Sequence, residues 1–152
     1  MKKDKEMFIG TKCGQAIKID TNTIEDFGLL GNKDYLIKTA KGDSVVSLVL
    51  YSPSKTKEIV FITKNGYGAK VRLMDIRVMG KGGSGVSFVK ITPQSGLVFD
   101  YFGVGTKKTF TVVTNKNKIS IPIGAIPTIK RGGRGVTIVK LAKGEKIIEV
   151  LV

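Results

Sequence analysis

Residues 58–66 read Glu58-Ile-Val-Phe-Ile-Thr-Lys-Asn-Gly66, a short apolar run that ends in a turn sequence. Runs of this length, rich in Val, Ile, Phe and Thr and bounded by Gly, Asn or Pro, are typical of β-strands. Similar runs occur at 86–91 and 136–141, and no window keeps a helical i, i+3, i+4, i+7 pattern for three turns. The sequence therefore predicts an all-β fold.

The run at 58–66 belongs to a repeat of about 50 residues. Three short motifs recur in register in the second and third repeats, and weaker copies stand in the first. In the second and third repeats, Phe61-Ile-Thr63 matches Val112-Val-Thr114, Gly82-Gly-Ser-Gly-Val86 matches Gly132-Gly-Arg-Gly-Val136, and Phe88-Val-Lys90 matches Ile138-Val-Lys140. The copies in the first repeat are Thr11-Lys-Cys-Gly14 and Leu36-Ile-Lys38. The first repeat also contains Ala40-Lys-Gly-Asp43, which returns in the third as Ala142-Lys-Gly-Glu145. We expect one domain, 1–152, built of repeats at approximately 7–57, 58–106 and 107–152.

Each repeat contains four strand candidates. They lie at 7–11, 15–20, 35–39 and 45–51, then 58–63, 69–73, 86–91 and 97–102, then 109–114, 118–121, 136–141 and 147–152. Four strands in a period of about 50 residues are the signature of propeller-like blades. A single β-barrel with accidental self-similarity is the alternative, which the several motifs in register disfavour.

Composition narrows the range of functions. The 26 Lys and Arg against 12 Asp and Glu give a formal charge of +14, and residues 107–152 alone hold 10 basic and 2 acidic side chains. A one-sided positive field of this kind favours polyanions as partners. Since the chain has no His, histidine triads and HExxH zinc sites are excluded.

The remaining composition points to a cytoplasmic protein without cofactors. Cys13 is the only cysteine, so it is expected to be a small packing residue in a reducing compartment rather than part of a disulfide or a zinc site. No signal peptide and no apolar run of about 18 residues is present, so no membrane role is expected. Asp75 and Asp100 form no recognisable catalytic pair of carboxylates, and no catalytic, metal-binding or cofactor-binding residue is assigned.

Two glycine-rich boxes are the candidate phosphate-binding motifs. The first, Gly80-Lys-Gly-Gly-Ser-Gly85, matches GxGxxG, but a strand follows it where a nucleotide-binding fold needs a helix. The second, Ile129-Lys-Arg-Gly-Gly-Arg-Gly135, sets three cations among glycines, and such a basic loop suits phosphate oxygens. The alternative is that the glycines only permit a turn and the cations are solvated.

These motifs resemble a known family. The run Phe61-Ile-Thr-Lys-Asn-Gly66, followed by Lys81-Gly-Gly-Ser-Gly-Val86 and Phe88-Val-Lys-Ile91, is similar to a repeat of the C-terminal domain of the DNA gyrase A subunit, or of its topoisomerase IV counterpart. The box at 129–135 resembles that family's Gln-Arg-Arg-Gly-Gly-Lys-Gly box. The resemblance covers nearly the whole chain and is weakest in the first repeat, where Gly31-Asn-Lys-Asp34 replaces the glycine cluster.

The resemblance implies a β-pinwheel whose blades exchange strands and whose basic rim bends DNA, through phosphate contacts independent of sequence, for supercoiling or substrate choice. It implies a non-catalytic part of an ATP-dependent type II topoisomerase. The partners would be double-stranded DNA and the rest of an A-type subunit, together with its ATPase subunit, in a bacterial or phage-type cytoplasm at the nucleoid. The expected DNA-binding residues are Lys130, Arg131, Gly132, Gly133, Arg134 and Gly135, then Lys81, Gly82, Gly83 and Gly85 as a degenerate copy, with Arg77, Arg72 and Lys118.

Two features depart from the family. Its domains have about six blades against three repeats here, and its best box lies in the first blade, not the last. A stand-alone module for protein interaction or structural support is therefore the main alternative function. A homodimer through open blade edges is a further one, since two chains supply six repeats.

Overall fold

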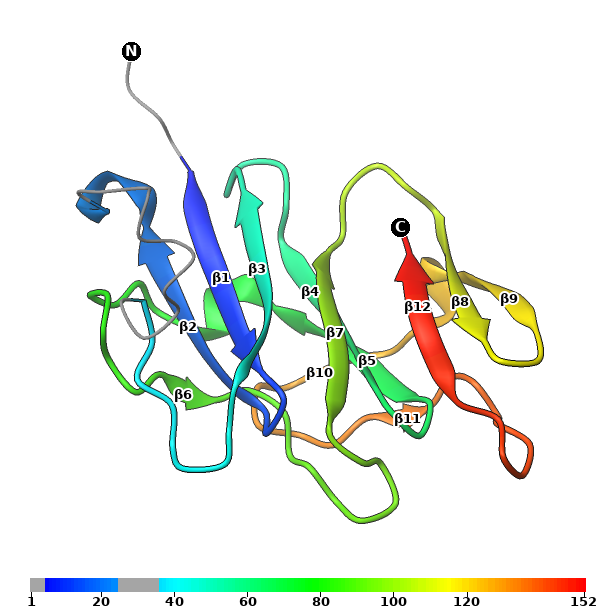
Figure 1. The fold of residues 1–152 in the computed structure, drawn as a ribbon. Coiled ribbons are helices and arrows are strands. Elements are labelled where there is room, and N and C mark those ends of the chain that lie inside the picture. The colour runs from blue at the N-terminus through cyan, green and yellow to red at the C-terminus, as the bar shows by residue number, and fades with distance from the viewer. Residues whose placement is uncertain (1–4, 25–35) are drawn as a thin grey trace.

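The structure, a computed structural model, describes residues 5–24 and 36–152. The described residues form three β-sheets that follow one another along an arc (Figure 1). The first sheet has the order β3 (Val45–Tyr51), β1 (Glu6–Thr11), β2 (Gln15–Asp20), β6 (Val86–Ser87). The second has the order β10 (Thr128–Ile129), β5 (Tyr67–Arg72), β4 (Glu58–Thr63), β7 (Val98–Gly103), and β11 (Val136–Thr137) also pairs with β5. The third has the order β12 (Ile147–Leu151), β8 (Thr109–Thr114), β9 (Lys118–Pro122).

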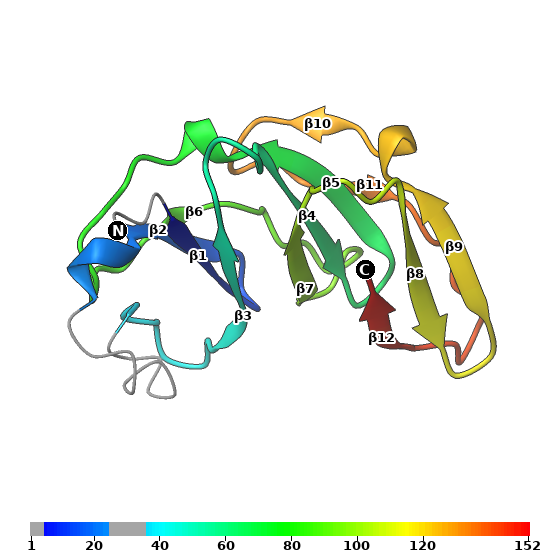
Figure 2. The ribbon, with the colours of Figure 1, turned by 90° about the horizontal axis from the view of Figure 1, so that it is seen from above.

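The all-β prediction is confirmed. No α-helix occurs between residues 5 and 24 or from 36 onward, and the helical segments there are three single 3-10 turns, η1 (Thr21–Thr23), η4 (Leu73–Asp75) and η5 (Ile123–Ala125). Figure 2 shows that β3, β7 and β12 lie along the concave side of the arc, while β10 lies on its convex side. The expected strands at 15–20, 45–51, 58–63 and 109–114 have the observed bounds of β2, β3, β4 and β8.

The third strand of each repeat differs from the prediction. In place of the expected strands at 86–91 and 136–141 there are the two-residue strands β6 and β11, and each pairs with the sheet of the preceding repeat. The ladder stops there because the N–H groups of Phe88 and Val89 both donate to the carbonyl oxygen of Gly14. The candidate at 35–39 lies partly outside the described residues, and within it Ile37 forms an isolated parallel bridge with Gly83. The strand β10 was not predicted.

The central strands are buried on both faces. In β4, the side chain of Phe61 packs into the core between the first and second sheets, whereas Val60 and Ile62 pack into the core between the second and third sheets. Alternate side chains of a strand point to opposite faces, so one apolar strand can serve two neighbouring cores. This position explains why the run at 58–63 is apolar on both faces.

An aromatic cluster joins the first two sheets. The ring centroid of Phe8 lies 4.9 Å from that of Phe88 and 5.3 Å from that of Tyr101. The Tyr101 hydroxyl donates to the carbonyl oxygen of Thr11 at 2.7 Å, and burial raises the pKa of Tyr101. Only glycine fits at position 10, because a Cβ there would lie 2.4 Å from the Tyr101 ring. The contact of strands β1 and β7 thus depends on a glycine beneath an aromatic ring.

Polar groups also cross between these sheets. The hydroxyl of Ser47 on β3 donates to Oδ1 of Asp100 on β7 at 2.8 Å, and the N–H of Tyr101 donates to the same oxygen at 2.8 Å. Burial raises the pKa of Asp100, and these two hydrogen bonds oppose the rise. The carboxylate form of Asp100 is therefore less favourable in the folded chain than in water.

Replacing Asp100→Asn is expected to flatten the pH dependence of stability. Because the folded pKa of Asp100 lies above the unfolded one, its contribution to the free energy of unfolding is largest below the unfolded pKa and is lost as the pH rises through the folded pKa. Asn keeps an acceptor for Ser47 and Tyr101 and does not titrate. Urea unfolding at a series of pH values from acidic to neutral tests this, and an unchanged pH profile would contradict it.

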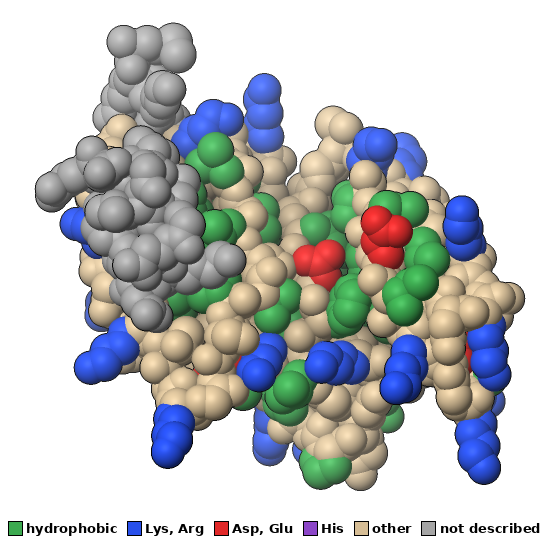
Figure 3. Space-filling view, in the orientation of Figure 1, with side chains coloured by type: hydrophobic (Ala, Val, Ile, Leu, Met, Phe, Trp, Pro, Cys, Tyr) green, Lys and Arg blue, Asp and Glu red, His purple; other side chains and the backbone are tan. Residues whose placement is uncertain are grey.

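Exposed apolar side chains occur on two of the strands that line the concave side. Leu50 on β3 and Ile148 on β12 are 55% and 59% exposed. Figure 3 shows hydrophobic side chains gathered in the middle of this face, with two acidic side chains among them and Lys and Arg around its margin. The concave face is therefore apolar at its centre and the positive charge lies outside it.

Candidate nucleic-acid interface

The box at 129–135 connects β10 to β11 and lies against the second repeat. The N–H of Gly132 donates to the carbonyl oxygen of Phe88 at 2.9 Å, and the N–H of Lys90 donates to that of Gly133 at 2.9 Å. A guanidinium nitrogen of Arg131 donates to the carbonyl oxygen of Ser87 at 2.9 Å. These bonds hold the box in place on the chain of the preceding repeat.

The glycines of this box let it approach protein backbone. Gly132 has a φ of +82°, a conformation that residues with a side chain rarely adopt. A Cβ on Gly135 would lie 2.8 Å from the backbone nitrogen and oxygen of Gly68, so any side chain would push the two repeats apart. Part of the glycine pattern thus has a structural role, as the alternative interpretation expected.

The degenerate box at 80–85 is built in the same way. The N–H of Gly82 donates to the carbonyl oxygen of Leu36 at 2.7 Å, and the N–H of Lys38 donates to that of Gly83 at 2.9 Å. Gly85 has a φ of +76°, and a Cβ there would lie 2.4 Å from the carbonyl oxygen of Ala16. Both boxes therefore pack on the repeat before them, while their basic side chains differ.

Three of the expected DNA-binding cations meet at one place. Lys130 and Arg131 of the box and Arg72 at the end of β5 line a surface hollow of about 310 Å³ together with Asp75 of η4. Nε of Arg72 lies 4.0 Å from Oδ1 of Asp75, and both Lys130 and Arg131 are exposed. We call these four residues the basic hollow. Its three cations against one carboxylate leave a local excess of positive charge that suits a phosphate.

The other expected cations lie outside the basic hollow. Arg134 and Arg77 are exposed and form no ion pair with any residue in 5–24 or 36–152, whereas Lys81 is half-buried. Lys118 is exposed at the start of β9, in the third sheet. The structure thus brings three of the predicted cations together and leaves these four apart from them.

The prediction missed three lysines that stand at one position of the repeat. Lys38, Lys90 and Lys140 each follow an Ile or Val in the repeated motif, and all three are exposed. The backbone of Lys38 and of Lys90 bonds to a glycine of the next box, which places both beside the boxes. Their spacing of 52 and 50 residues was the signal that identifies them.

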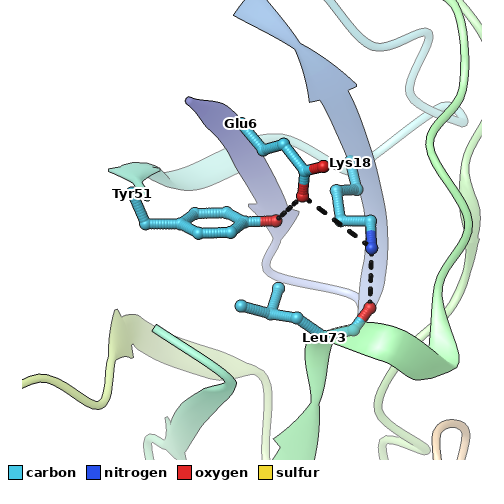
Figure 4. Close-up of polar contacts among 4 residues, drawn as sticks. All are labelled: Glu6, Lys18, Tyr51 and Leu73. Carbon is cyan, nitrogen blue, oxygen red and sulfur yellow. Dashed lines mark hydrogen bonds and ion pairs between the residues drawn. The ribbon is translucent and has the colours of Figure 1, made fainter. Parts of the chain in front are cut away.

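A buried lysine, Lys18, holds the 3-10 turn η4 that carries Asp75 of the basic hollow. Nζ of Lys18 on β2 donates to the carbonyl oxygen of Leu73 in η4 at 2.9 Å, and it lies 3.9 Å from Oε1 of Glu6 (Figure 4). The hydroxyl of Tyr51 donates to the same oxygen of Glu6 at 2.8 Å. Burial and the neighbouring Glu6 raise the pKa of Tyr51. This cluster ties η4, which carries Asp75, to the first sheet.

Replacing Lys18→Met is expected to lower the free energy of unfolding by about 1–3 kcal/mol, because the buried carbonyl of Leu73 loses its donor. Lys70→Met is a matched control, since Lys70 occupies the equivalent position of β5 and its ammonium contacts no described acceptor. Urea denaturation of the two variants measures the difference. Equal losses in both variants would show that the Lys18 contact is not what stabilises η4.

Metal and membrane features are absent from the described part of the chain. Within residues 5–24 and 36–152, no three His, Cys, Asp or Glu side chains are grouped so that they could hold a metal ion. In the same ranges no helix is long and apolar enough to cross a membrane. Cys13 is exposed, so the expectation that it is a small packing residue was wrong. Partial desolvation, together with the nearby Asp43, raises the pKa of its thiol.

Similar proteins are found by both sequence and structure. The DNA gyrase A subunit of Staphylococcus epidermidis is 26% identical over 148 residues, which is 97% of this chain and 17% of that protein. For the Staphylococcus aureus protein the identity is 26% over 146 residues, or 95% of this chain and 16% of that protein. The chain thus spans about a sixth of the length of these relatives.

Among solved structures, the C-terminal domain of DNA topoisomerase IV superposes with a TM-score of 0.80 at 17% identity, covering 99% of this chain and 46% of that one. The E. coli ParC C-terminal domain gives a TM-score of 0.69 at 16% identity, covering 99% and 62%. At such low identity these likenesses show the fold, and they confirm the predicted β-pinwheel class.

The family model described as "DNA gyrase C-terminal domain, beta-propeller" matches residues 57–99 and 119–152, which together are half of the chain. These ranges include both glycine boxes and the basic hollow, so the matched residues are those that carried the resemblance in the sequence. The chain therefore belongs to the DNA gyrase C-terminal domain family.

Proposed function

We propose that this chain is a non-catalytic, DNA-binding accessory domain of a type II topoisomerase. The observation that carries the proposal is the basic hollow, where Arg72 of the second repeat and Lys130 and Arg131 of the third meet on the surface. Cations from two repeats at one place can hold successive phosphates of a backbone. Membership in the gyrase C-terminal domain family supports the same partner.

The contacts would be to phosphates and independent of base sequence. The described residues contain no α-helix that could enter a major groove. The predicted cations lie on more than one repeat, and the arc in Figure 2 provides a curved support along which a duplex can bend. Bending of this kind would present DNA to the rest of an A-type subunit, and a further partner would be the ATPase subunit.

Salt dependence tests the proposal. Fluorescence anisotropy with a labelled duplex should give an affinity that falls linearly with salt on a log-log plot, with a slope of about −0.9 for each phosphate neutralised. Two duplexes of unrelated sequence should bind alike. A flat salt response, or binding confined to one sequence, would rule out a backbone-binding domain.

The same partners imply a location. A domain that bends DNA for a topoisomerase would act in a bacterial or phage-type cytoplasm, at the nucleoid. Immunofluorescence or a fluorescent fusion would show the chain together with the nucleoid stain, and a diffuse signal that ignores the DNA would count against this placement.

A protein-interaction module is the second candidate function. The observations that favour it are the hydrophobic side chains gathered in the middle of the concave face (Figure 3) and the exposure of Leu50 on β3 and of Ile148 on β12, each more than half. Under this alternative the basic side chains are solvated, and a gel shift at moderate salt would show no retarded duplex. A homodimer through open blade edges stays a prediction under either function.

A further inference from the structure

Strand exchange between repeats follows one pattern in the first two sheets. In the first sheet, Ala16 and Gln15 of β2 pair with Val86 and Ser87 of the second repeat. In the second sheet, Gly68 and Tyr67 of β5 pair with Val136 and Thr137 of the third repeat. The outer edge of each hairpin is thus covered by a strand from the next repeat. In the third sheet, β9 pairs with β8 alone among the described strands.

Accepting a strand depends on a glycine in the hairpin turn. The carbonyl oxygen of Gly14 accepts the N–H groups of Phe88 and Val89 at 2.8 and 3.0 Å. Gly14 has a φ of +91°, and a Cβ there would lie 2.2 Å from the carbonyl oxygen of Val89. Any other residue would be strained and would also collide with the backbone of the incoming strand.

The second hairpin repeats this arrangement. The carbonyl oxygen of Gly66 accepts the N–H groups of Ile138 and Val139 at 2.9 and 3.0 Å. Gly66 has a φ of +86°, and a Cβ there would lie 2.1 Å from the carbonyl oxygen of Val139. The first two turns therefore share one acceptor geometry, which rests on glycine in both.

The third hairpin lacks this geometry. Its turn, Asn115-Lys116-Asn117, contains no glycine, and the carbonyl oxygen of Asn117 already accepts the N–H of Thr114 at 2.8 Å. Since none of the described residues other than glycine has a positive φ, the turn takes another course.

The strand after this turn differs as well. The last pair before the turn is Gly10 with Ala16 in the first hairpin, Ile62 with Gly68 in the second and Val113 with Lys118 in the third. An exposed lysine therefore stands in the third sheet where the first two sheets have a small buried residue. A Cβ on Gly68 would lie 2.5 Å from the carbonyl oxygen of Phe61 and 2.6 Å from the end of the Ile138 side chain in the exchanged segment. Lysine on an edge strand is also a common means of preventing pairing.

We infer that the outer edge of the third sheet, β9, is closed to an exchanged strand of the kind that covers the first two sheets. A second copy of the chain is not expected to continue the exchange there, because the turn lacks the positive-φ glycine whose carbonyl oxygen accepts the incoming N–H groups in the first two sheets. Strand exchange at β9 is therefore not a route to a homodimer. Lys118 remains exposed on this edge for solvent or a polyanion.

A peptide that copies the exchanged segment tests the inference. The probe is labelled Gly132–Leu141, titrated at high salt against three chains, with a scrambled peptide as control. The unaltered chain and Lys118→Ala are expected not to bind it, because both keep the glycine-free turn. A chain in which Asn115–Lys118 is replaced by the five residues Lys64–Gly68 is expected to bind it saturably, since that turn already accepts a strand in the second sheet.

Two results would overturn the inference. The first is saturable binding of the probe to the unaltered chain, or a dimer in sedimentation whose β9 amides are protected from hydrogen exchange. The second is a grafted chain that folds, as judged by circular dichroism and cooperative unfolding, yet does not bind the probe. The titration needs no DNA, so its outcome is independent of the proposed DNA binding.

Discussion

Removing the three cations of the third box, by Lys130→Ala, Arg131→Ala and Arg134→Ala together, is expected to lower the affinity for duplex DNA by about tenfold per cation at low salt. Each lost phosphate contact also reduces the salt slope by about 1. All three side chains are exposed, and Lys130 and Arg131 line the basic hollow with Arg72. Anisotropy titrations at several salt concentrations give both quantities, and the loss should be equal for unrelated duplexes.

Two controls separate local contacts from net charge and from folding. The triple variant Lys41→Ala, Lys55→Ala and Lys107→Ala removes the same charge from exposed positions outside the box. The double variant Lys130→Ala and Arg134→Ala keeps the bond from Arg131 to the Ser87 carbonyl oxygen, and so keeps the box in place. Equal losses of affinity in the two triple variants would contradict a localised site and leave only a general effect of charge.

Local features of the fold could be predicted from the sequence. The strands at 58–63 and 109–114 are recognised by β-branched runs and turn residues, which act over a few positions. A threonine also closes two of the turns in the same way, since Oγ1 of Thr11 accepts the N–H of Gln15 and Oγ1 of Thr63 that of Tyr67. Because these local signals repeat, the blade architecture could be predicted as well.

Long-range placement could not be predicted in the same way. A two-residue strand such as Val86–Ser87 carries too little pattern to show which sheet it joins, and the answer depends on the room beside Ala16. Lys18 alternates with the apolar Ile17 and Ile19, a pattern that is typical of a strand with one solvated face. That face is covered by η4, some 55 residues later in the chain.

The candidate site shows the same division. The box was visible because its cations and glycines are adjacent in sequence, and Lys130 and Arg131 do lie together. Arg72 was among the expected residues, but its meeting with them depends on the parallel pairing of Thr128 and Ile129 with β5. The approach of Gly135 to the backbone of Gly68 in the neighbouring repeat could not be predicted, because it depends on the pairing of β11 with β5.

Replacing Gly66→Ala is expected to destabilise the chain by at least about 3 kcal/mol. The positive φ of +86° alone costs a residue with a side chain about 1–2 kcal/mol. The new Cβ would in addition lie 2.1 Å from the carbonyl oxygen of Val139, which is backbone and cannot turn aside. The substitution therefore loosens the exchanged segment, whose N–H groups at Ile138 and Val139 bond to Gly66.

Gly42 and Gly144 provide the matched controls for this effect. Both have a positive φ, of +86° and +77°, but a Cβ on either would meet nothing within 4 Å. Gly42→Ala and Gly144→Ala should thus lose only the conformational term of about 1–2 kcal/mol in urea denaturation. Hydrogen exchange should also rise at residues 136–139 in Gly66→Ala and stay unchanged in the controls. If all three variants lose the same stability, the glycine serves the turn alone and the exchanged strand does not depend on it.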